Sequence, residues 1–136
     1  MTDTLSKIQR SRNMRQIQAR DTRPELLVRK LLHAQGFRFR LHHSTLPGRP
    51  DIVLPKYGAV IFVHGCFWHA HKCVAGRRPK SNVEYWDKKL STNVQRDKRV
   101  RRQLHNLGWR CLIIWECELR NLDRLHRKLA LVPSLK

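Results

Sequence analysis

Acidic residues are scarce in this sequence. Across 136 residues, 10 Asp and Glu stand against 29 Lys and Arg, which gives a formal net charge of +19. Such an excess of one sign repels itself and suits a polyanionic partner, usually nucleic acid. The basic residues are spread along the chain rather than confined to one amphipathic helix, so the charge argues against a role at a membrane surface.

Long apolar runs are also missing. No stretch approaches the ~20 residues needed to cross a bilayer, and the N-terminus has no hydrophobic segment typical of a secretory signal. We therefore expect a cytoplasmic monomer with no membrane partner. In that compartment the four cysteines point to metal binding or the core rather than to disulfides. Repeats and low-complexity linkers are absent, and the length and the 40% hydrophobic residues suit one globular domain.

A basic arm, residues 1–20, precedes the expected domain, residues 21–136. Within the arm, Ile8, Met14 and Ile17 form only a thin apolar stripe among basic side chains. The segment is either a solvated tail or an arm that becomes ordered on DNA. We favour the DNA-binding arm, because a row of like charges needs phosphates to offset it.

The start of the domain predicts a helix. Thr22 can cap it, Pro24 suits its first turn, and Glu25 completes a capping box. Glu25 is therefore most simply a capping residue. The helix continues to Gly36 with leucines at helical spacing, namely Leu26, Leu27, Leu31 and Leu32.

The rest of the domain alternates strand and helix patterns. Residues 37–42 alternate apolar and basic side chains, as a strand with one exposed face does. Two apolar runs, 51–54 and 59–63, flank Pro55-Lys56-Tyr57-Gly58 and predict a hairpin of largely buried strands. A long helix, a buried strand and a short C-terminal helix follow, at 82–107, at 109–115 and from Asn121. This order predicts an α/β domain with helices on a mixed β-sheet.

Four residues after the hairpin have the chemistry of zinc ligands. Cys66, His71 and Cys73 lie close together, and Cys117 follows the last strand. Thiolates and imidazoles are the ligands of tetrahedral zinc, and four protein ligands would make the site structural. The alternative is a set of buried or idle thiols. Cys111 competes for the fourth position, but its place inside a strand indicates a core residue.

A second group has the chemistry of phosphodiester hydrolysis. Asp51 opens the first strand of the hairpin, while His64 and His69 end and follow the second. A carboxylate there can hold Mg²⁺, which takes oxygen ligands. A histidine can take a proton from the attacking water or give one to the leaving oxygen. The alternative is that these residues have ordinary structural roles.

Aromatic side chains form a third group. Phe67 and Trp68 stand in a loop between expected ligands, where no core requires them. Trp86, Lys89 and Asn93 share one face of the long helix by their spacing, and this combination suits a face that contacts DNA bases better than a core stripe. Apolar wedges unstack base pairs at a cost of a few kcal/mol, which is least at a mismatch. The alternative for Trp86 is packing into the hydrophobic core.

At these residues the sequence closely resembles the very-short-patch-repair (Vsr) mismatch endonucleases. The similarity covers most of the chain in order, and the HGCFWH motif is highly specific to this family. The matching segments are Arg12-Asn13-Met14-Arg15, LPGRPD at 46–51, HGCFWHAHKC at 64–73, Trp86 with Asn93-Val94 and Arg96-Asp97, and LGWR with IIWEC across 107–117.

The resemblance implies a restriction-endonuclease-like fold braced by zinc. It also implies a nick beside the thymine of a T:G mismatch, of the kind left when 5-methylcytosine deaminates. The expected partners are double-stranded DNA with that mismatch and other mismatch-repair proteins. The roles it implies are Mg²⁺ binding by Asp51, general base by His69, assistance at the scissile phosphate by His64, an outer-shell acid in Glu25, DNA wedges in Phe67, Trp68 and Trp86, and a groove contact by Met14 on the arm.

The chain departs from the family pattern at Val63, where threonine is expected. Valine serves equally if the main-chain carbonyl binds Mg²⁺, and it does not if the hydroxyl matters. Two other functions compete with mismatch nicking. A zinc-stabilised DNA-binding module would leave Asp51 and His69 without a purpose, and a restriction-type endonuclease on intact duplex would not need Phe67 and Trp68.

Overall fold

The fold is seen in a computed structural model that describes residues 22–41, 45–73 and 79–134. The expectations for the arm, Met14 included, lie outside the described residues. Within them, the predicted α/β fold with a mixed sheet flanked by helices is confirmed. No helix in the described ranges is long and apolar enough to span a bilayer.

One sheet with the strand order β1-β2-β3-β4 forms the centre of the described chain. β2 (Ile52–Leu54) and β3 (Ala59–His64) are antiparallel, so the predicted hairpin is confirmed. A 3₁₀ turn, Pro55–Tyr57, joins them and ends at Gly58, whose φ of 60° suits a residue without a Cβ. β3 then pairs in parallel with β4 (Arg110–Trp115), which brings His64 level with Trp115.

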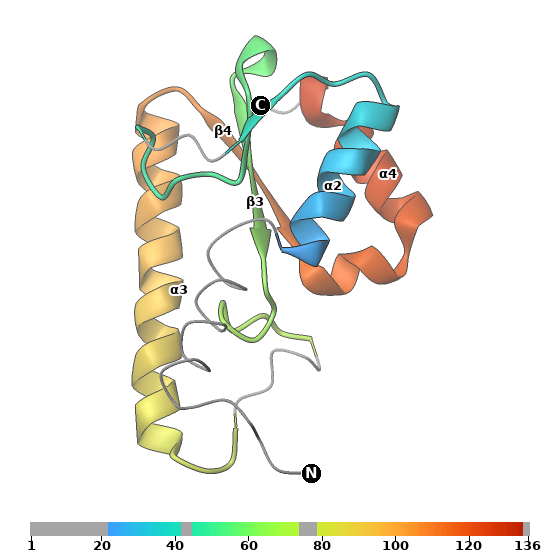
Figure 1. Cartoon of the computed structure of the whole chain (residues 1–136). Helices are drawn as coiled ribbons and strands as arrows, with labels where there is room; N and C mark the ends of the chain where they lie inside the picture. The colour runs from blue at the N-terminus through green and yellow to red at the C-terminus, as the bar shows by residue number, and fades with distance from the viewer. Residues whose placement is uncertain (1–21, 42–44, 74–78, 135–136) are drawn as a thin grey trace, which may run out of the picture.

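In the part of the chain that the structure describes, three helices cover the two faces of this sheet (Figure 1). α2 (Arg23–Ala34) and α4 (Leu122–Ala130) lie on one face, and the long α3 (Val83–Asn106) lies on the other. Thr22 caps α2 by accepting a hydrogen bond from the Glu25 N–H at 3.3 Å. Asn121 caps α4 in the same way, as its position in the sequence predicted.

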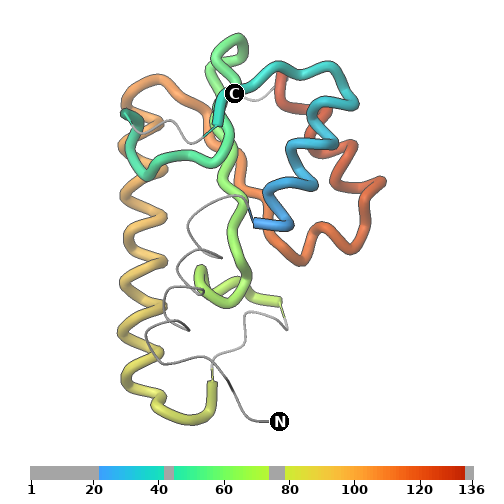
Figure 2. Tube along the Cα trace, in the orientation of Figure 1, coloured from blue at the N-terminus to red at the C-terminus, as the bar shows by residue number. Residues whose placement is uncertain are grey.

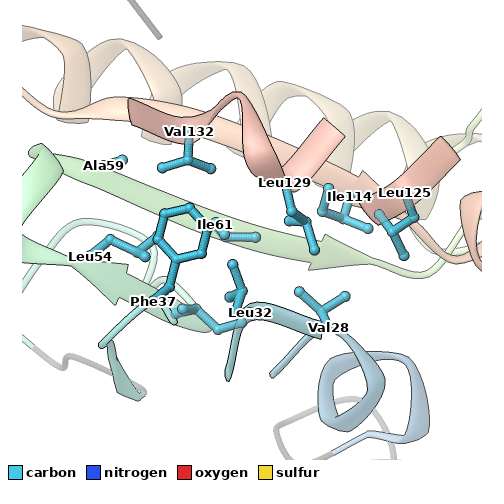
Figure 3. Packing of buried hydrophobic residues seen from close by; sticks show 11 residues of the cluster. Val28, Leu32, Phe37, Leu54, Ala59, Ile61, Ile114, Leu125, Leu129 and Val132 are labelled. Atoms are coloured by element: carbon cyan, nitrogen blue, oxygen red, sulfur yellow. The ribbon is translucent and has the colours of Figure 1, made fainter. Parts of the chain in front are cut away.

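Alternation along β3 divides its side chains between two cores. Ala59 and Ile61 join the larger core with α2 and α4 (Figure 3), whereas Val60 and Phe62 join a smaller core beneath α3. Successive strand residues point to opposite faces, so His64 falls on the face that α3 covers. Because that face carries the smaller core, it leaves room for a polar site at the end of the strand.

Three sequence expectations need correction. The strand expected at 37–42 is reduced to β1 (Arg40–Leu41), because its partner β2 is only three residues long and is followed by Pro55. The strand expected to be buried at 109–115 is mostly half-buried, since β4 is an edge strand. The leucine pattern of the first helix does not match its buried face. In α2 the buried residues are Glu25, Val28 and Leu32, while Leu26 is 49% exposed.

Candidate active site

The candidate catalytic residues meet where β3 ends. Asp51 directly precedes β2, His64 closes β3, and the loop after β3 returns beside α3 carrying His69 (Figure 2). Here the structure forms a cleft of about 340 Å³ between the sheet and α3. Its lining residues are Gly48, Arg49, Asp51, Phe62, Val63, His64, His69, Arg96, Asp97, Val100 and Arg101.

Asp51 is half-buried and lies near a second carboxylate, that of Glu25. Its Oδ2 accepts a hydrogen bond from the Val63 N–H at 2.7 Å. Burial raises the pKa of Asp51 to about 7, and the nearby Glu25 carboxylate contributes to the increase, against the lowering effects of the Val63 N–H and of Arg29. Two carboxylates this close repel each other when both are ionised, so the arrangement suits a divalent cation.

Glu25 stands in the first turn of α2, where its backbone N–H donates to the capping Thr22, as predicted. The residue is only 1% exposed, however, and its Oε2 accepts from Arg29 at 3.0 Å. The carboxylate therefore faces the Asp51 side of the helix rather than the solvent. The capping box predicted that this side chain turns back towards the start of the helix, whereas the structure places its carboxylate next to Arg29 and near Asp51.

The two histidines form a parallel stack. The rings of His64 and His69 lie 3.7 Å apart between centroids, with their planes 2° apart. Burial, together with the neighbouring His69 and Arg101, lowers the pKa of His64 to about 4, so His64 is neutral near pH 7. Its Nδ1 is buried, and no described residue supplies that atom with a hydrogen-bond partner.

His69 is oriented by a residue that the sequence analysis did not single out. Its Nδ1 lies 2.5 Å from Oδ2 of Asp97, on α3. In neutral His69 this contact assigns the proton to Nδ1, which donates to the carboxylate and leaves Nε2 as an acceptor. A signal for Asp97 was available, since it stands four residues after Asn93 and continues the same face of the helix.

The four expected zinc ligands converge on one point. The sulfur atoms of Cys66, Cys73 and Cys117 and a ring nitrogen of His71 all lie within 4.8 Å of one another. Cys117 Sγ and His71 Nδ1 are 3.5 Å apart, close to the roughly 3.6 Å between ligand atoms of a tetrahedral zinc with bonds of about 2.1 and 2.3 Å. The cluster could hold a metal ion with no position open to water.

Cys111 takes no part in this cluster. It pairs with Val60 across the β3–β4 ladder and packs against the smaller core. Burial raises the pKa of its thiol. The interpretation of Cys111 as a core residue is therefore confirmed.

The aromatic side chains gather beside the cleft. Phe67 contacts the rings of Trp68 and Trp86 at centroid distances of 5.1 and 5.2 Å, and Tyr85 contacts Trp86 at 5.1 Å. Within the described residues, neither core cluster includes the half-buried Trp86, whose ring contacts Phe67, Trp68 and Tyr85 instead. We call Phe67, Trp68, Tyr85 and Trp86 the aromatic cluster.

Asn93 and Lys89 behave differently from each other. The Asn93 Nδ2 donates to the Trp68 carbonyl oxygen at 3.0 Å, so its amide holds the loop that carries the aromatic cluster. Lys89 is exposed. Contact of either side chain with bases stays a prediction, as does the role of Met14.

Comparison with known proteins decides the family. The family model described as DNA mismatch endonuclease Vsr matches residues 2–75. The chain is 48% identical over 125 residues to the DNA mismatch endonuclease Vsr of Escherichia coli K12, which covers 92% of this chain and 80% of that protein. The chain belongs to the Vsr family of DNA mismatch endonucleases. The resemblance predicted from the sequence is thereby confirmed.

Other Vsr relatives bear the name of nicking enzymes. The type II nicking enzyme V.XorIIP of Xanthomonas oryzae pv. oryzae is 50% identical over 129 residues, with 95% of each chain covered. The type II nicking enzyme V.NmeAIP of Neisseria meningitidis is 44% identical over 131 residues, covering 93% of this chain and 94% of that enzyme. Membership of this family identifies the chain as a DNA endonuclease of mismatch repair.

Proposed function

We propose that this Vsr protein nicks one strand of a duplex beside the thymine of a T:G mismatch, by Mg²⁺-dependent phosphodiester hydrolysis. The observation that carries the proposal is the loop of residues 65–73. It bears Phe67 and Trp68 of the aromatic cluster and, one residue later, His69 of the cleft. A base-pair wedge and a hydrolytic site are thus held at a fixed separation.

His69 is the proposed general base. Its Nδ1–H is held by Asp97, so Nε2 can take a proton from the attacking water. The imidazolium that forms is stabilised by the Asp97 carboxylate at the other nitrogen. His64, kept neutral by burial, assists at the scissile phosphate as a hydrogen-bonding group rather than as a cation.

Asp51 and the main-chain carbonyl of Val63 are the proposed Mg²⁺ ligands. The Val63 N–H already points to Asp51, and the N–H and C=O of one strand residue leave on the same side. The Val63 side chain packs against the larger core, which favours the backbone over a side-chain hydroxyl at this position. Mg²⁺, when bound, would offset the negative charge that develops on the phosphate.

Cys66, His71, Cys73 and Cys117 are the proposed ligands of a structural Zn²⁺. The ion would tie the loop after β3 to the segment after β4, since Cys117 lies in the 3₁₀ segment Glu116–Arg120. Zinc, when bound, supplies folding free energy rather than chemistry. These ligands belong to a single endonuclease domain over residues 21–136, with residues 1–20 as its DNA-binding arm.

The aromatic residues Phe67, Trp68 and Trp86 are the proposed mismatch sensors. Unstacking a base step costs a few kcal/mol and costs least where the pair is already mismatched. A protein that must unstack its target therefore favours T:G over a matched pair. Two rival functions each leave a group unused, because a binding module needs no His69–Asp97 pair and an enzyme for intact duplex needs no wedge.

The deciding experiment incubates the protein with Mg²⁺ and end-labelled duplexes that differ only at one T:G or matched pair. Denaturing gels should show one nick beside the thymine, on that strand alone. Equal nicking of the matched duplex would favour the restriction-type enzyme. Tight T:G binding without any nick would favour the binding module.

A further inference from the structure

Three arginines line the same cleft from two walls. Arg49 belongs to the turn before β2, whereas Arg96 and Arg101 stand on α3. All three side chains are exposed. Among the described residues, no carboxylate forms an ion pair with any of them.

The backbone holds Arg49 in place at a cost. Its φ of 47° lies in the left-handed region that side chains other than glycine rarely adopt. The preceding Gly48 is pressed so closely on α3 that an added Cβ would lie 2.3 Å from Val100 Cγ1. Residues with strained backbone conformations of this kind cluster at functional sites, where the position of the side chain outweighs the conformational cost.

Arginine side chains keep their charge at any pH at which a protein is folded, so these three are fixed cations in the described lining of the cleft. Arg101 lies near enough to His64 for its charge to lower the pKa of that histidine. Against the three guanidinium groups, the cleft lining offers the carboxylates of Asp51 and Asp97.

We propose that Arg49, Arg96 and Arg101 form a phosphate clamp, which rests on the function proposed above. Arg49 holds the DNA backbone from the turn before β2, and Arg96 and Arg101 hold it from α3. The scissile phosphate is thereby centred between Asp51 and His69. Guanidinium groups suit this task because they bind phosphate oxygens with two parallel hydrogen bonds.

The first test measures binding to a T:G duplex in Ca²⁺ across a range of salt concentrations. Arg49→Ala, Arg96→Ala and Arg101→Ala should each reduce the log–log salt slope by about 1, because each removes one phosphate contact. Arg102→Ala is the matched control, since Arg102 is exposed on α3 but does not line the cleft. Its slope should equal that of the parent.

A second variant separates position from stability. Arg49→Gly suits the left-handed backbone better than arginine does, so its melting temperature should equal or exceed the parent's while its salt slope falls. Arg49→Lys restores a charge but not the paired hydrogen bonds. It should regain the slope yet nick at least ~5-fold more slowly than the parent, as expected for a group that aligns phosphate.

A scan with neutral phosphates locates each contact. Duplexes carrying one methylphosphonate near the cleaved bond should weaken binding of the parent, and at one position Arg49→Ala should cause no further loss. The clamp is overturned if Arg49→Ala and Arg96→Ala keep the parent's slope, or if Arg102→Ala loses as much as they do. The slopes need no cleavage, so a parent that binds but fails to nick T:G duplex overturns the proposed function and leaves this test intact.

Discussion

Two clusters with overlapping chemistry stand at the end of β3, and they differ in what surrounds them. His69 turns toward α3, where it contacts Asp97 and lines the cleft, whereas His71 turns toward the cysteines. Only Ala70 separates the two histidines, and its φ of 50° marks the reversal between them. Trp115 stands between the clusters, stacked on His71 at 4.1 Å and edge-on to His64 at 5.2 Å.

The difference teaches that environment assigns the role of a residue type. In the cysteine cluster, every metal position has a protein donor, so the site can only brace the fold. In the cleft, Asp51 lies near the Glu25 carboxylate, which suits binding of a cation. Asp97 contacts only Nδ1 of His69, so Nε2 of that ring is left to act as a proton acceptor. Substitutions in the two clusters should therefore fail in different ways.

The largest effect is expected at Cys117. Cys117→Ala removes one of four metal ligands, so zinc content should fall well below one ion per chain, and the melting temperature should fall by about 10 °C or more. Cys111→Val is the control, because that side chain packs in the smaller core and a similar volume costs under about 1.5 kcal/mol. Elemental analysis and thermal unfolding measure both. Full stability of Cys117→Ala without metal would show that the cluster is idle.

Asp51→Asn should abolish nicking while T:G binding survives. The same substitution should increase the stability of the fold at high pH, although it abolishes activity. Burial raises the pKa of Asp51 from 3.8 to about 7, so the folded protein holds this proton more tightly than the unfolded chain does. The stabilisation from that proton is complete below about pH 4 and is lost as the pH rises through about 7. Without divalent cation, Asp51→Asn should be more stable than the parent at pH 8 and equal to it near pH 4, by urea unfolding. Equal stability at both pH values would contradict the buried setting.

His69→Ala should lower the single-turnover nicking rate by roughly two to four orders of magnitude. Asp97→Asn should lower it less, by about 10- to 100-fold, since it disturbs the orientation of the base rather than removing it. Binding in Ca²⁺ should change little for either variant. Asp123→Asn, an exposed change on α4, is the control. Unaltered nicking by His69→Ala would transfer the role of base elsewhere.

Trp68→Ala should leave the chemistry in place and reduce recognition. Without the ring, the ratio of T:G to matched binding should shrink by about 10-fold, because less unstacking energy separates the two duplexes. Competition binding in Ca²⁺ measures the ratio directly. Trp109→Phe is the control, since Trp109 packs against the smaller core. A normally folded Trp68→Ala that discriminates as well as the parent would leave Lys89 to sense the mismatch.

Local chemistry explains which elements were predictable. The starts of α2 and α4 could be predicted from Thr22 and Asn121, because a capping side chain bonds to the backbone N–H only three residues further on. The hairpin followed from two apolar runs around Pro55 and Gly58. The burial of β4 was misjudged, because a strand's own residues do not reveal whether it lies at the edge of a sheet.

The candidate site was predictable where residue type is restrictive. Three cysteines and a histidine have few alternative roles together, and the structure brings them within reach of one ion. Asp97 was missed, and a place for Glu25 at the site was expected only from the family resemblance, because both depend on helices packing against distant strands. Arg49 was missed for another reason, since its place in the cleft depends on how the turn before β2 packs on α3 through Gly48 and Val100.

The tight turn after β3 also constrains how the chain can change its length. Surface loops usually accept inserted or deleted residues. In this loop the His69 N–H donates to the Gly65 carbonyl and the His71 N–H donates to the Cys66 carbonyl. These hydrogen bonds fix the position of each histidine relative to the end of β3. One residue added between positions 66 and 71 would rotate His69 away from Asp97 or pull His71 from Cys117. A library of single-residue insertions should therefore find this loop as intolerant as a core strand, although much of it reaches the surface.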